Sequence, residues 1–348
     1  MLKIKHTLCP SCSVGCGINV VLNDGKLVGT FPYKRHQINE GKNCLNGRNS
    51  IEMYNNRFDE DIISNSNKSL DEVISELKSA NPSEVTVIAS GNNSVEEIEA
   101  INDFAQSMNY NIGFYADNLK NFENIASYDE IENAEKLFVI GDLLYKNPLL
   151  GRKIIHAKKN GATINALSKS ENAVIFNIAD NSSTNSIQEF LDENKTDIDD
   201  TSIIVFNYAE DSEDLDKIEE IFNATNCKIL PVFSKTNTKG ALNIINANTK
   251  EEMVELLNNT KILLVFNDDV VDEIDFDYAK ISKIISFAPC ENETTKISNI
   301  IIPIKTWLEQ DGSFVNAMGE SQNFTKIIES DVLSEIEIID DLKNKIEG

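Results

Sequence analysis

The sequence contains no run of about eighteen apolar residues, which is the length that a helix needs to cross a membrane. Its first residues also lack the apolar stretch that forms the centre of a secretory signal peptide. We therefore expect no membrane span and a cytoplasmic location, where thiols stay reduced and grouped cysteines bind metal more often than they form disulfides.

Basic residues are few compared with acidic ones: 32 Lys and Arg stand against 57 Asp and Glu, for a formal net charge of -25. A surface this negative repels nucleic acid phosphates, and no long basic stretch compensates for it. The composition therefore argues against nucleic acid binding. It is compatible with docking to a basic partner and carries no information about the fold.

Histidine occurs only three times, and no serine or cysteine arrangement around these residues suggests a hydrolase triad. The chain has 348 residues, of which 41% are hydrophobic and 26% charged, as is typical of globular proteins. That length is too great for one small core, so we expect two or three subdomains.

Cysteine is unevenly distributed: four of the six cysteines lie in the first 44 residues, in the spacing C-x2-C-x3-C-x27-C. Three thiolates from one tight loop and a fourth from a later turn are typical of [4Fe–4S] sites. Structural zinc, disulfides and free thiols are the alternatives, although zinc usually takes two C-x2-C knuckles and the second is missing here. The predicted cluster ligands are Cys9, Cys12, Cys16 and Cys44.

Residues 1–58 are predicted to form this cluster domain, with β-hairpins and no helix. Two short strands, residues 18–22 and 26–31, flank Asn23-Asp24-Gly25, and Asp-Gly is a strong hairpin signal because it supplies positive φ. The domain is too small to be stable without its metal.

From residue 59 onward, short apolar strands alternate with helices. This pattern predicts an α/β fold with two Rossmann-like units, each a parallel sheet covered by helices on both faces. The predicted strands are residues 84–89, 136–140, 163–167, 173–178, 202–206, 228–233, 262–266, 284–287 and 300–304. The predicted helices are residues 69–78, 94–108, 149–159, 186–193, 214–223, 250–258 and 334–345.

We divide the α/β region as follows. Residues 59–135 together with 200–330 form the first α/β unit, which is discontinuous, and residues 136–199 form an inserted, nucleotide-binding-like unit. The Asp-rich stretch 192–200 is interpreted as a linker, and residues 331–348 as a C-terminal docking helix.

The cysteine loop Cys9–Gly17 and the α/β units after it resemble the molybdopterin oxidoreductase family of the bis-guanine-dinucleotide type. The loop is similar to that of formate dehydrogenase α subunits; the B subunit of formylmethanofuran dehydrogenase and the large iron–sulfur subunit of complex I also belong to this family. The resemblance continues at residues 137–142 with Asn147-Pro148, at 237–241, at 300–303 and at 309–316, the last similar to E-x-D-G-T-F-x-N.

The resemblance implies a [4Fe–4S] cluster and a molybdenum or tungsten bis(molybdopterin guanine dinucleotide). The residues that it implies for the pterin pocket are Gly141, Asn147, Lys239, Gly240, Asp311, Gly312 and Asn316.

Four departures from the family bear on function. The lysine that usually follows the fourth cysteine is replaced by Asn46, and there is no cysteine between Cys44 and Cys227 to bind molybdenum or tungsten. Asp117 or Ser127 would be the oxygen ligands left in that region. The family's Asp-Pro-Arg is replaced by residues 168–170, Ser-Lys-Ser. The sequence has no C-terminal barrel domain, which formylmethanofuran dehydrogenase carries on a separate subunit.

The interpretation that we favour is an iron–sulfur subunit that carries electrons through one [4Fe–4S] cluster within a larger redox complex. Its partners would be other redox subunits, an iron–sulfur or flavin protein, and a separate barrel subunit. Independent catalysis is doubtful on this interpretation. The alternative is a catalytic subunit with a molybdenum or tungsten pterin and formate or CO2 chemistry. A redox-silent scaffold with zinc at the four cysteines is the third hypothesis.

Overall fold

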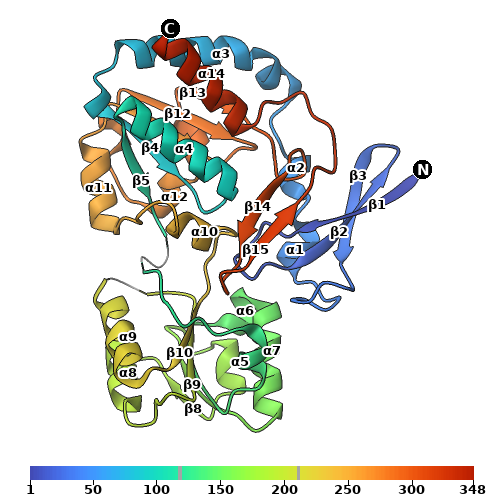
Figure 1. Cartoon of the computed structure of the whole chain (residues 1–348), viewed down its shortest axis with the longest axis vertical. Coiled ribbons are helices and arrows are strands. Elements are labelled where there is room, and N and C mark those ends of the chain that lie inside the picture. Colours follow the sequence, from blue (N-terminus) through green and yellow to red (C-terminus); the bar gives the residue numbers. More distant parts are fainter. Residues whose placement is uncertain (117–119, 210–211) are drawn as a thin grey trace.

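The computed structural model describes residues 1–116, 120–209 and 212–348. In this part of the chain, two five-stranded sheets with helices on both faces form two bodies, one above the other in Figure 1. A three-stranded antiparallel sheet carries the N-terminus beside them, and a two-stranded hairpin lies between that sheet and the upper body. The α/β class with an antiparallel N-terminal domain is therefore confirmed.

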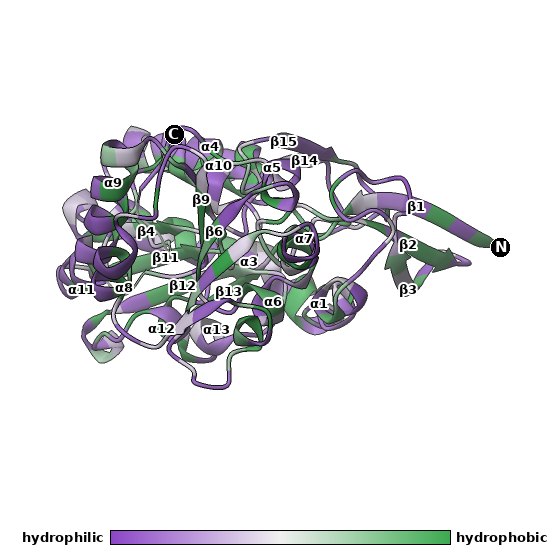
Figure 2. Ribbon diagram, turned by 90° about the horizontal axis from the view of Figure 1, so that it is seen from below, coloured by the Kyte–Doolittle hydropathy of each residue, from purple (hydrophilic) through white to green (hydrophobic). Residues whose placement is uncertain are grey.

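The N-terminal sheet has the order β1-β2-β3 and projects from the rest of the chain (Figure 2). The predicted hairpin is present, since Asp24 and Gly25 have φ of 49° and 83°. Strand β1 was not predicted, because five of its seven residues are exposed and give no buried apolar signal. The strands are β1 (Leu2–Leu8), β2 (Gly17–Asn23) and β3 (Lys26–Pro32).

The expectation of no helix in this domain was wrong. Two short helices follow Cys44: α1 (Leu45–Asn49) and α2 (Glu52–Asn55). The Cys44 sulfur accepts a hydrogen bond from the Gly47 N–H and so caps α1. Cysteine is not among the usual capping residues, so the sequence gives no ordinary start signal here.

The upper body is built on a parallel sheet of order β13-β12-β11-β4-β5. Its strands are apolar along their whole length because successive side chains enter different cores on the two faces. Val87 packs with helices α3, α4 and α14, whereas Ile88 packs with α11. The strands are β4 (Val85–Ala89), β5 (Asn111–Phe114), β11 (Ile262–Phe266), β12 (Lys283–Ala288) and β13 (Ile300–Pro303).

The lower body is built on a second parallel sheet, of order β10-β9-β6-β7-β8. One face packs against α5 and α7 in a core that also contains Cys9, Val14 and Cys16, so the cysteine loop and this body share one core. The strands are β6 (Lys136–Ile140), β7 (Thr163–Leu167), β8 (Asn181–Ser183), β9 (Ser202–Phe206) and β10 (Lys228–Pro231).

Sheet membership corrects the expected division of the α/β region. Residues 200–231 were assigned to the first unit, yet β9 pairs with β6 and β10 pairs with β9 in the sheet of the second unit. The stretch 192–200 is correspondingly a connection from α8 to β9 within one unit and does not link two units. Pairing between distant strands depends on the three-dimensional packing, so the alternation of strands and helices could not specify it.

Among the predicted elements, one has a different type and another begins much earlier than predicted. Residues 173–178 are a 3-10 helix, η2 (Val174–Asn177), because the Asp142 carboxylate accepts hydrogen bonds from the Val174 and Ile175 N–H groups. The helix predicted from residue 69 begins at Glu60, capped by Asp59. Its first turns are mostly exposed and lack the apolar period that reveals a buried helical face.

The remaining elements cover the sheets. The C-terminal helix α14 packs on α3 and α4, and the hairpin β14–β15 lies against α4 and β1. No helix within the described ranges is long and apolar enough to cross a membrane. The helices are α3 (Glu60–Ser79), α4 (Val95–Met108), α5 (Tyr128–Glu132), α6 (Leu143–Lys146), α7 (Pro148–Lys159), α8 (Ile187–Asn194), α9 (Ser212–Thr225), α10 (Thr238–Leu242), α11 (Lys250–Asn258), α12 (Val270–Glu273), α13 (Glu293–Ile297) and α14 (Glu335–Glu347). The short 3-10 helices η1 (Pro82–Glu84) and η3 (Tyr278–Lys280) and the strands β14 (Gly312–Val315) and β15 (Ser321–Phe324) complete the list.

Candidate metal centre and the adjoining cleft

The four N-terminal cysteines line one small cavity. Cys9, Cys12 and Cys16 lie on the loop between β1 and β2, and Cys44 reaches the same cavity from the N-terminus of α1. All four are free thiols; Cys9 and Cys16 are buried, and Cys12 and Cys44 are half-buried. The predicted ligands are therefore brought together by the fold, and their assignment to a cluster stays a prediction.

The chemistry of these thiols fits a cluster that supplies positive charge. Burial raises the pKa of Cys12 to about 12 and also raises the pKa values of Cys9 and Cys16, and the neighbouring thiols raise them further. Thiolates are the iron ligands of such clusters, so iron must replace the protons. Among the described residues, no group of three or more His, Cys, Asp or Glu side chains is placed to hold one metal ion. In a cubane, each thiolate binds a different iron.

The cysteine loop is fixed by hydrogen bonds from distant segments. Ser13 exchanges two bonds with Phe233, its Oγ accepting from the Phe233 N–H at 2.8 Å and its own N–H donating to the Phe233 carbonyl at 3.2 Å. The Ala317 N–H donates to the Ser13 carbonyl at 2.7 Å, and the Tyr128 hydroxyl donates to the Val14 carbonyl at 3.0 Å. These contacts hold the backbone of the loop in place between the ligands.

The hairpin β14–β15 closes the other side of the loop. Gln322 Nε2 donates to the carbonyl of Gly15 at 3.1 Å. Gly15 has φ of 76°, and a Cβ there would lie 2.3 Å from Gln322 Oε1 and 2.8 Å from Asn316 Cβ. Glycine is thus required here both by the left-handed backbone and by the close approach of the hairpin.

A group of ion pairs joins the cluster domain to α7. The Glu40 carboxylate contacts both Arg152 and Lys153, and Lys153 also contacts Glu132 at 2.5 Å. Lys153 is almost completely buried. Hydrogen bonds from Arg152 and Lys153 lower the pKa of Glu40, so this carboxylate stays ionised between the two domains.

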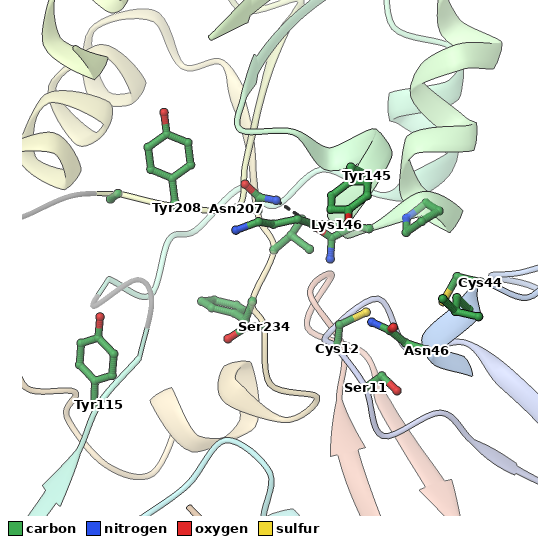
Figure 3. A pocket seen from close by; sticks show the side chains of 16 residues that line it. Ser11, Cys12, Cys44, Asn46, Tyr115, Tyr145, Lys146, Asn207, Tyr208 and Ser234 are labelled. Carbon is green, nitrogen blue, oxygen red and sulfur yellow. Dashed lines mark hydrogen bonds between the residues drawn. The ribbon is translucent and has the colours of Figure 1, made fainter. Parts of the chain in front are cut away.

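A cleft with a volume of about 600 Å³ begins at the cysteine cavity. Ser11, Cys12 and Cys44 form one wall of it, and Tyr145 and Lys146 form a second wall (Figure 3). Tyr115 and Tyr208 lie farther from the cysteines, and Asn207 and Ser234 also line the cleft.

A second cavity, of about 870 Å³, continues from the first and shares Tyr115, Tyr145, Lys146, Asn207 and Tyr208 with it. It extends to residues 168–170 beyond β7. Both cavities therefore lie outside the carboxyl ends of β6, β7 and β9, where ligands of open α/β sheets bind.

The structure separates the residues predicted for a pterin pocket. Asn147 lines the cleft and accepts a hydrogen bond from Asn207 Nδ2 at 3.1 Å, and Gly141 lies directly against Asn207. Lys239 and Gly240 are buried in α10, where Lys239 contacts Asn121 and burial lowers the pKa of its amine.

The predicted residues of the segment 309–316 have structural contacts. Asp311 accepts a hydrogen bond from the Lys326 N–H, Gly312 packs on Phe324, and Asn316 contacts Glu320 beside the cysteine loop. The roles of these residues in cofactor binding stay predictions. Asp117 lies outside the described residues, and Ser127 caps α5 by accepting a hydrogen bond from the Glu130 N–H.

Several residues of the cleft were not predicted from the sequence: Tyr145, Lys146, Asn207, Tyr208 and Lys250. Asn207 and Tyr208 directly follow β9, so the rule that ligands bind beyond strand ends would have found them. Lys146 and Lys250 carry no such signal, because helices of ordinary amphipathic sequence bring them to the cleft.

The fold and the site define an iron–sulfur domain joined to paired α/β units. A family model described as "Molybdopterin oxidoreductase Fe4S4 domain" matches residues 2–56, and a second, "Molybdopterin oxidoreductase", matches residues 67–342. The chain therefore belongs to the molybdopterin oxidoreductase family. The expected [4Fe–4S] cluster is confirmed at the level of the domain, and the family match also supports a molybdenum or tungsten pterin as a possible cofactor.

Curated relatives include an F420-dependent formate dehydrogenase 2 subunit alpha from Methanococcus maripaludis, 29% identical over 190 residues, or 47% of this chain. An F420-dependent formate dehydrogenase subunit alpha from Methanocaldococcus jannaschii is 30% identical over 187 residues, also 47% of this chain. The match covers 28% of the length of each relative. These relatives are named as subunits, so association with further chains is documented for them.

Two solved structures have a similar fold. Acetylene hydratase from Pelobacter acetylenicus matches 99% of this chain and 69% of its own, with a TM-score of 0.65 and 12% identity. A chain of the formyltransferase/hydrolase complex (FhcABCD) from Methylorubrum extorquens in complex with methylofuran matches 81% of this chain and 96% of its own, with a TM-score of 0.54 and 10% identity. At these identities the similarity concerns the fold alone.

Proposed function

We propose that this chain is an iron–sulfur redox subunit that holds one [4Fe–4S] cluster through Cys9, Cys12, Cys16 and Cys44. The observation that carries the proposal is the convergence of these four thiols on one cavity, on a loop fixed by three distant segments. When bound, such a cluster supplies one-electron transfer.

The residues around the thiols have separate tasks in this proposal. The buried thiols Cys9 and Cys16 exclude water from the protein side of the site. Cys12 and Cys44 line the cleft as well as the cavity, so they provide the shortest connection between a cluster and whatever occupies the cleft.

The side chains that line the cleft favour a role in electron transfer and argue against catalysis on a substrate. Beyond the cluster cysteines, its polar side chains are the hydroxyls, amides and amines of Tyr, Ser, Asn and Lys. Asn46 stands at the cleft wall where the resemblance implies a lysine. We further propose a cytoplasmic location and partners that are redox subunits, an iron–sulfur or flavin protein, with a separate barrel subunit.

The test is metal analysis of protein purified without oxygen, together with whatever co-purifies. We expect about four irons and four sulfides per chain, the content of a cubane, and substoichiometric zinc, molybdenum and tungsten. Stoichiometric zinc in place of iron would refute the proposal.

A pair of matched variants assigns the ligands. Cys12→Ser should lose most iron, sulfide and visible absorption, because a hydroxyl is a poor replacement for a thiolate ligand. Cys290→Ser is the control, since Cys290 is also half-buried and lies outside the cysteine cavity. Full iron content in Cys12→Ser would remove Cys12 from the ligand set.

The second candidate function is a catalytic subunit with a molybdenum or tungsten pterin for formate or CO2 chemistry. The cleft favours it, because about 600 Å³ and about 870 Å³ of joined space next to the cysteines are sufficient for a large cofactor. Stoichiometric molybdenum or tungsten in the same metal analysis would establish this candidate and displace the first.

A further inference from the structure

The charge of this chain is divided unevenly between the cluster domain and the α/β bodies. Residues 1–58, the cluster domain, contain 8 Lys and Arg and 3 Asp and Glu, so their formal net charge is +5. The rest of the chain contains 24 Lys and Arg and 54 Asp and Glu, for a net charge of -30. A negatively charged molecule is therefore repelled by the bodies and attracted to the cluster domain.

One face of the N-terminal sheet is apolar and exposed. In the register of the three strands, Ile4 lies opposite Val21 and Asn19 lies opposite Phe31. Side chains alternate between the two faces along a strand, so Leu2, Ile4, Val21 and Phe31 share one face, which we call the outer face. Leu2, Ile4 and Phe31 are 66%, 57% and 40% exposed. The sheet projects from the rest of the chain (Figure 2), so another molecule can reach this face.

The opposite face of the same sheet packs against the protein. Ile18, Val20 and Leu22 are buried there, and the Lys5 amine donates to the Ile327 carbonyl at 2.9 Å. The core of the domain therefore lies on this inner face, and the apolar side chains of the outer face are available for contact with another molecule. Contiguous exposed apolar residues of this kind mark protein interaction sites.

The outer face continues toward the cysteine loop. His6 belongs to the same face, and its ring stacks on that of Tyr33 with the two centroids 4.1 Å apart. The Tyr33 ring lies 6.2 Å from that of His36. The His36 ring lies directly against Gly17, the residue that follows the predicted ligand Cys16. A protein bound on the outer face would therefore lie beside the cluster site.

Basic side chains surround the outer face. Lys3 and Lys26 lie at the hairpin end of the sheet, Lys34 and Arg35 follow β3 toward the cysteine loop, and all four are exposed. In the part of the chain that the structure describes, Lys34 and Arg35 have no ion-pair partner, whereas a lysine of the lower body such as Lys217 contacts two carboxylates. The cations around the outer face can therefore pair with the carboxylates of a partner.

We propose that the outer face, with the basic side chains around it, is the docking surface for an acidic protein that carries single electrons. The inference rests on the proposed function, because it names the class of partner with which the cluster would exchange electrons. Charge complementarity selects this occupant. A second copy that presented the same face would bring together two domains with a charge of +5 each, and these would repel one another. Encounters between redox proteins use small interfaces and are weak, as suits a few apolar residues inside a charged rim.

The probe is a plant-type [2Fe–2S] ferredoxin, a small acidic electron carrier, titrated into the intact, anaerobically purified protein in a calorimeter. We expect one ferredoxin per chain and an affinity that falls at least about tenfold between about 0.1 M and 1 M salt, because the Debye length shortens from about 10 Å to about 3 Å. No binding at 0.1 M salt, or binding that salt does not weaken, would overturn the proposal. Self-association in analytical ultracentrifugation that Ile4→Ser abolishes would assign the face to a second copy and would overturn it as well.

Matched variants locate the docking surface. Ile4→Ser should weaken ferredoxin binding by about tenfold, because the apolar area of the isoleucine is no longer removed from water. Lys34→Glu should weaken it by about fivefold, because repulsion replaces attraction at the rim. The controls are Ile62→Ser and Lys159→Glu, which make the same changes at exposed positions of α3 and α7. Equal effects of the variants and their controls would show that ferredoxin binds elsewhere.

Iron and sulfide content, measured on the same samples, separates this inference from the proposed function. Ile4→Ser and Lys34→Glu should keep the full iron content of the wild type, because both side chains are exposed and neither is a predicted ligand. A protein with its iron that does not bind ferredoxin would refute the docking surface alone. Binding of ferredoxin by a protein without iron would refute the cluster alone.

Discussion

At the scale of single residues, Lys146 supplies a positive charge close to the position where the family motif usually has a lysine. The resemblance implies a lysine after the fourth cysteine, where this chain has Asn46. The exposed side chain of Lys146, at the end of α6, lines both the cysteine cavity and the cleft. A cation is thus placed beside the cluster site from a different segment of the chain.

Replacing Lys146 should therefore change the cluster potential. A nearby positive charge stabilises the reduced, more negative state of a cluster, so Lys146→Met should lower its midpoint potential. A Coulomb energy on the order of 1 kcal/mol corresponds to about 40 mV for one electron. Redox titration followed by electron paramagnetic resonance gives the value, and Lys159→Met is the control. Equal potentials in the two variants would contradict this role.

Gly15 and Gly25 form a natural pair for testing the hairpin clamp. Both have positive φ, 76° and 83°, so alanine costs about 1 kcal/mol of backbone energy at either position. At Gly15, Cβ would also collide with Gln322 and Asn316, whereas at Gly25 no atom lies within 4 Å. Gly15→Ala should cost about 1–3 kcal/mol more and reduce iron content, measured by denaturant unfolding and iron assay. Equal losses of stability and of iron in both variants would show that the hairpin can move away from the added Cβ without destabilising the protein.

At the scale of elements, two glutamates in the first turn of α14 have opposite pH dependence. Burial, and then the nearby Glu97, raise the pKa of Glu335 well above its usual value, and Asn93 Nδ2 donates to it at 2.6 Å. A backbone hydrogen bond within the Ser334 capping box lowers the pKa of Glu337 to about 2. The fold thus favours the protonated form of Glu335 and the ionised form of Glu337.

The sign of each effect follows from linkage. Because the folded pKa of Glu335 exceeds the unfolded value, its proton stabilises the fold at low pH, and this stability is lost as pH rises from about 4.5 through the folded pKa. A glutamine at this position has no proton to lose. The free energy of unfolding of Glu335→Gln should therefore rise relative to that of the wild type by up to about 1.4 kcal/mol per pH unit in that window. Urea unfolding at pH 5 and pH 8 measures it. A difference that does not grow with pH would contradict a protonated Glu335.

Glu337→Gln is the matched control on the same turn of helix. The folded pKa of Glu337 is below the unfolded value, so its contribution is present above about pH 4.5 and is lost as pH falls toward 2. The side chain is partly exposed, so the variant should lose only about 1 kcal/mol at pH 7 and less at low pH. A trend with pH in the same direction as that of Glu335→Gln would refute the assignment.

At the scale of the whole molecule, the cluster domain and the two sheets depend on different forces. The sheets have cores on both faces, whereas the N-terminal domain contributes few buried residues of its own and shares its core with the lower body. Small domains of this kind rely on their metal for folding. The domain should therefore be the part that responds to loss of iron.

Chelation of iron should raise the rate of amide hydrogen exchange in residues 9–49 by at least about tenfold. A tenfold faster rate corresponds to a decrease of about 1.4 kcal/mol in the free energy of local opening. Exchange in β4, β11, β6 and β9 should not change, because apolar packing holds these central strands. Mass spectrometry of exchanged peptides, with the iron-loaded protein as reference, makes the comparison. Uniform acceleration across the chain would show that the metal stabilises the whole molecule.

Local signals in the sequence were enough for the parts of the fold that form locally. Strands β6, β7, β9 and β11 were predicted at their observed bounds because each is a continuous apolar run between turns. Helix α4 was predicted as an amphipathic helix from the apolar period of residues 94–108. The α5 helix, α6 and the first half of α3 gave weaker signals and were missed.

The sequence by itself determined that four cysteines are spaced for one cluster and that the chain alternates strands with helices, because spacing and periodicity are properties of neighbouring residues. Only the tertiary structure decided that β9 pairs with β6 and β10 with β9, that the hairpin β14–β15 clamps the cysteine loop, and that Lys146 lines the cysteine cavity. Those contacts join residues far apart in the chain, and they form because they allow the apolar surfaces of the whole chain to be buried together. A pattern of neighbouring residues therefore does not predict them.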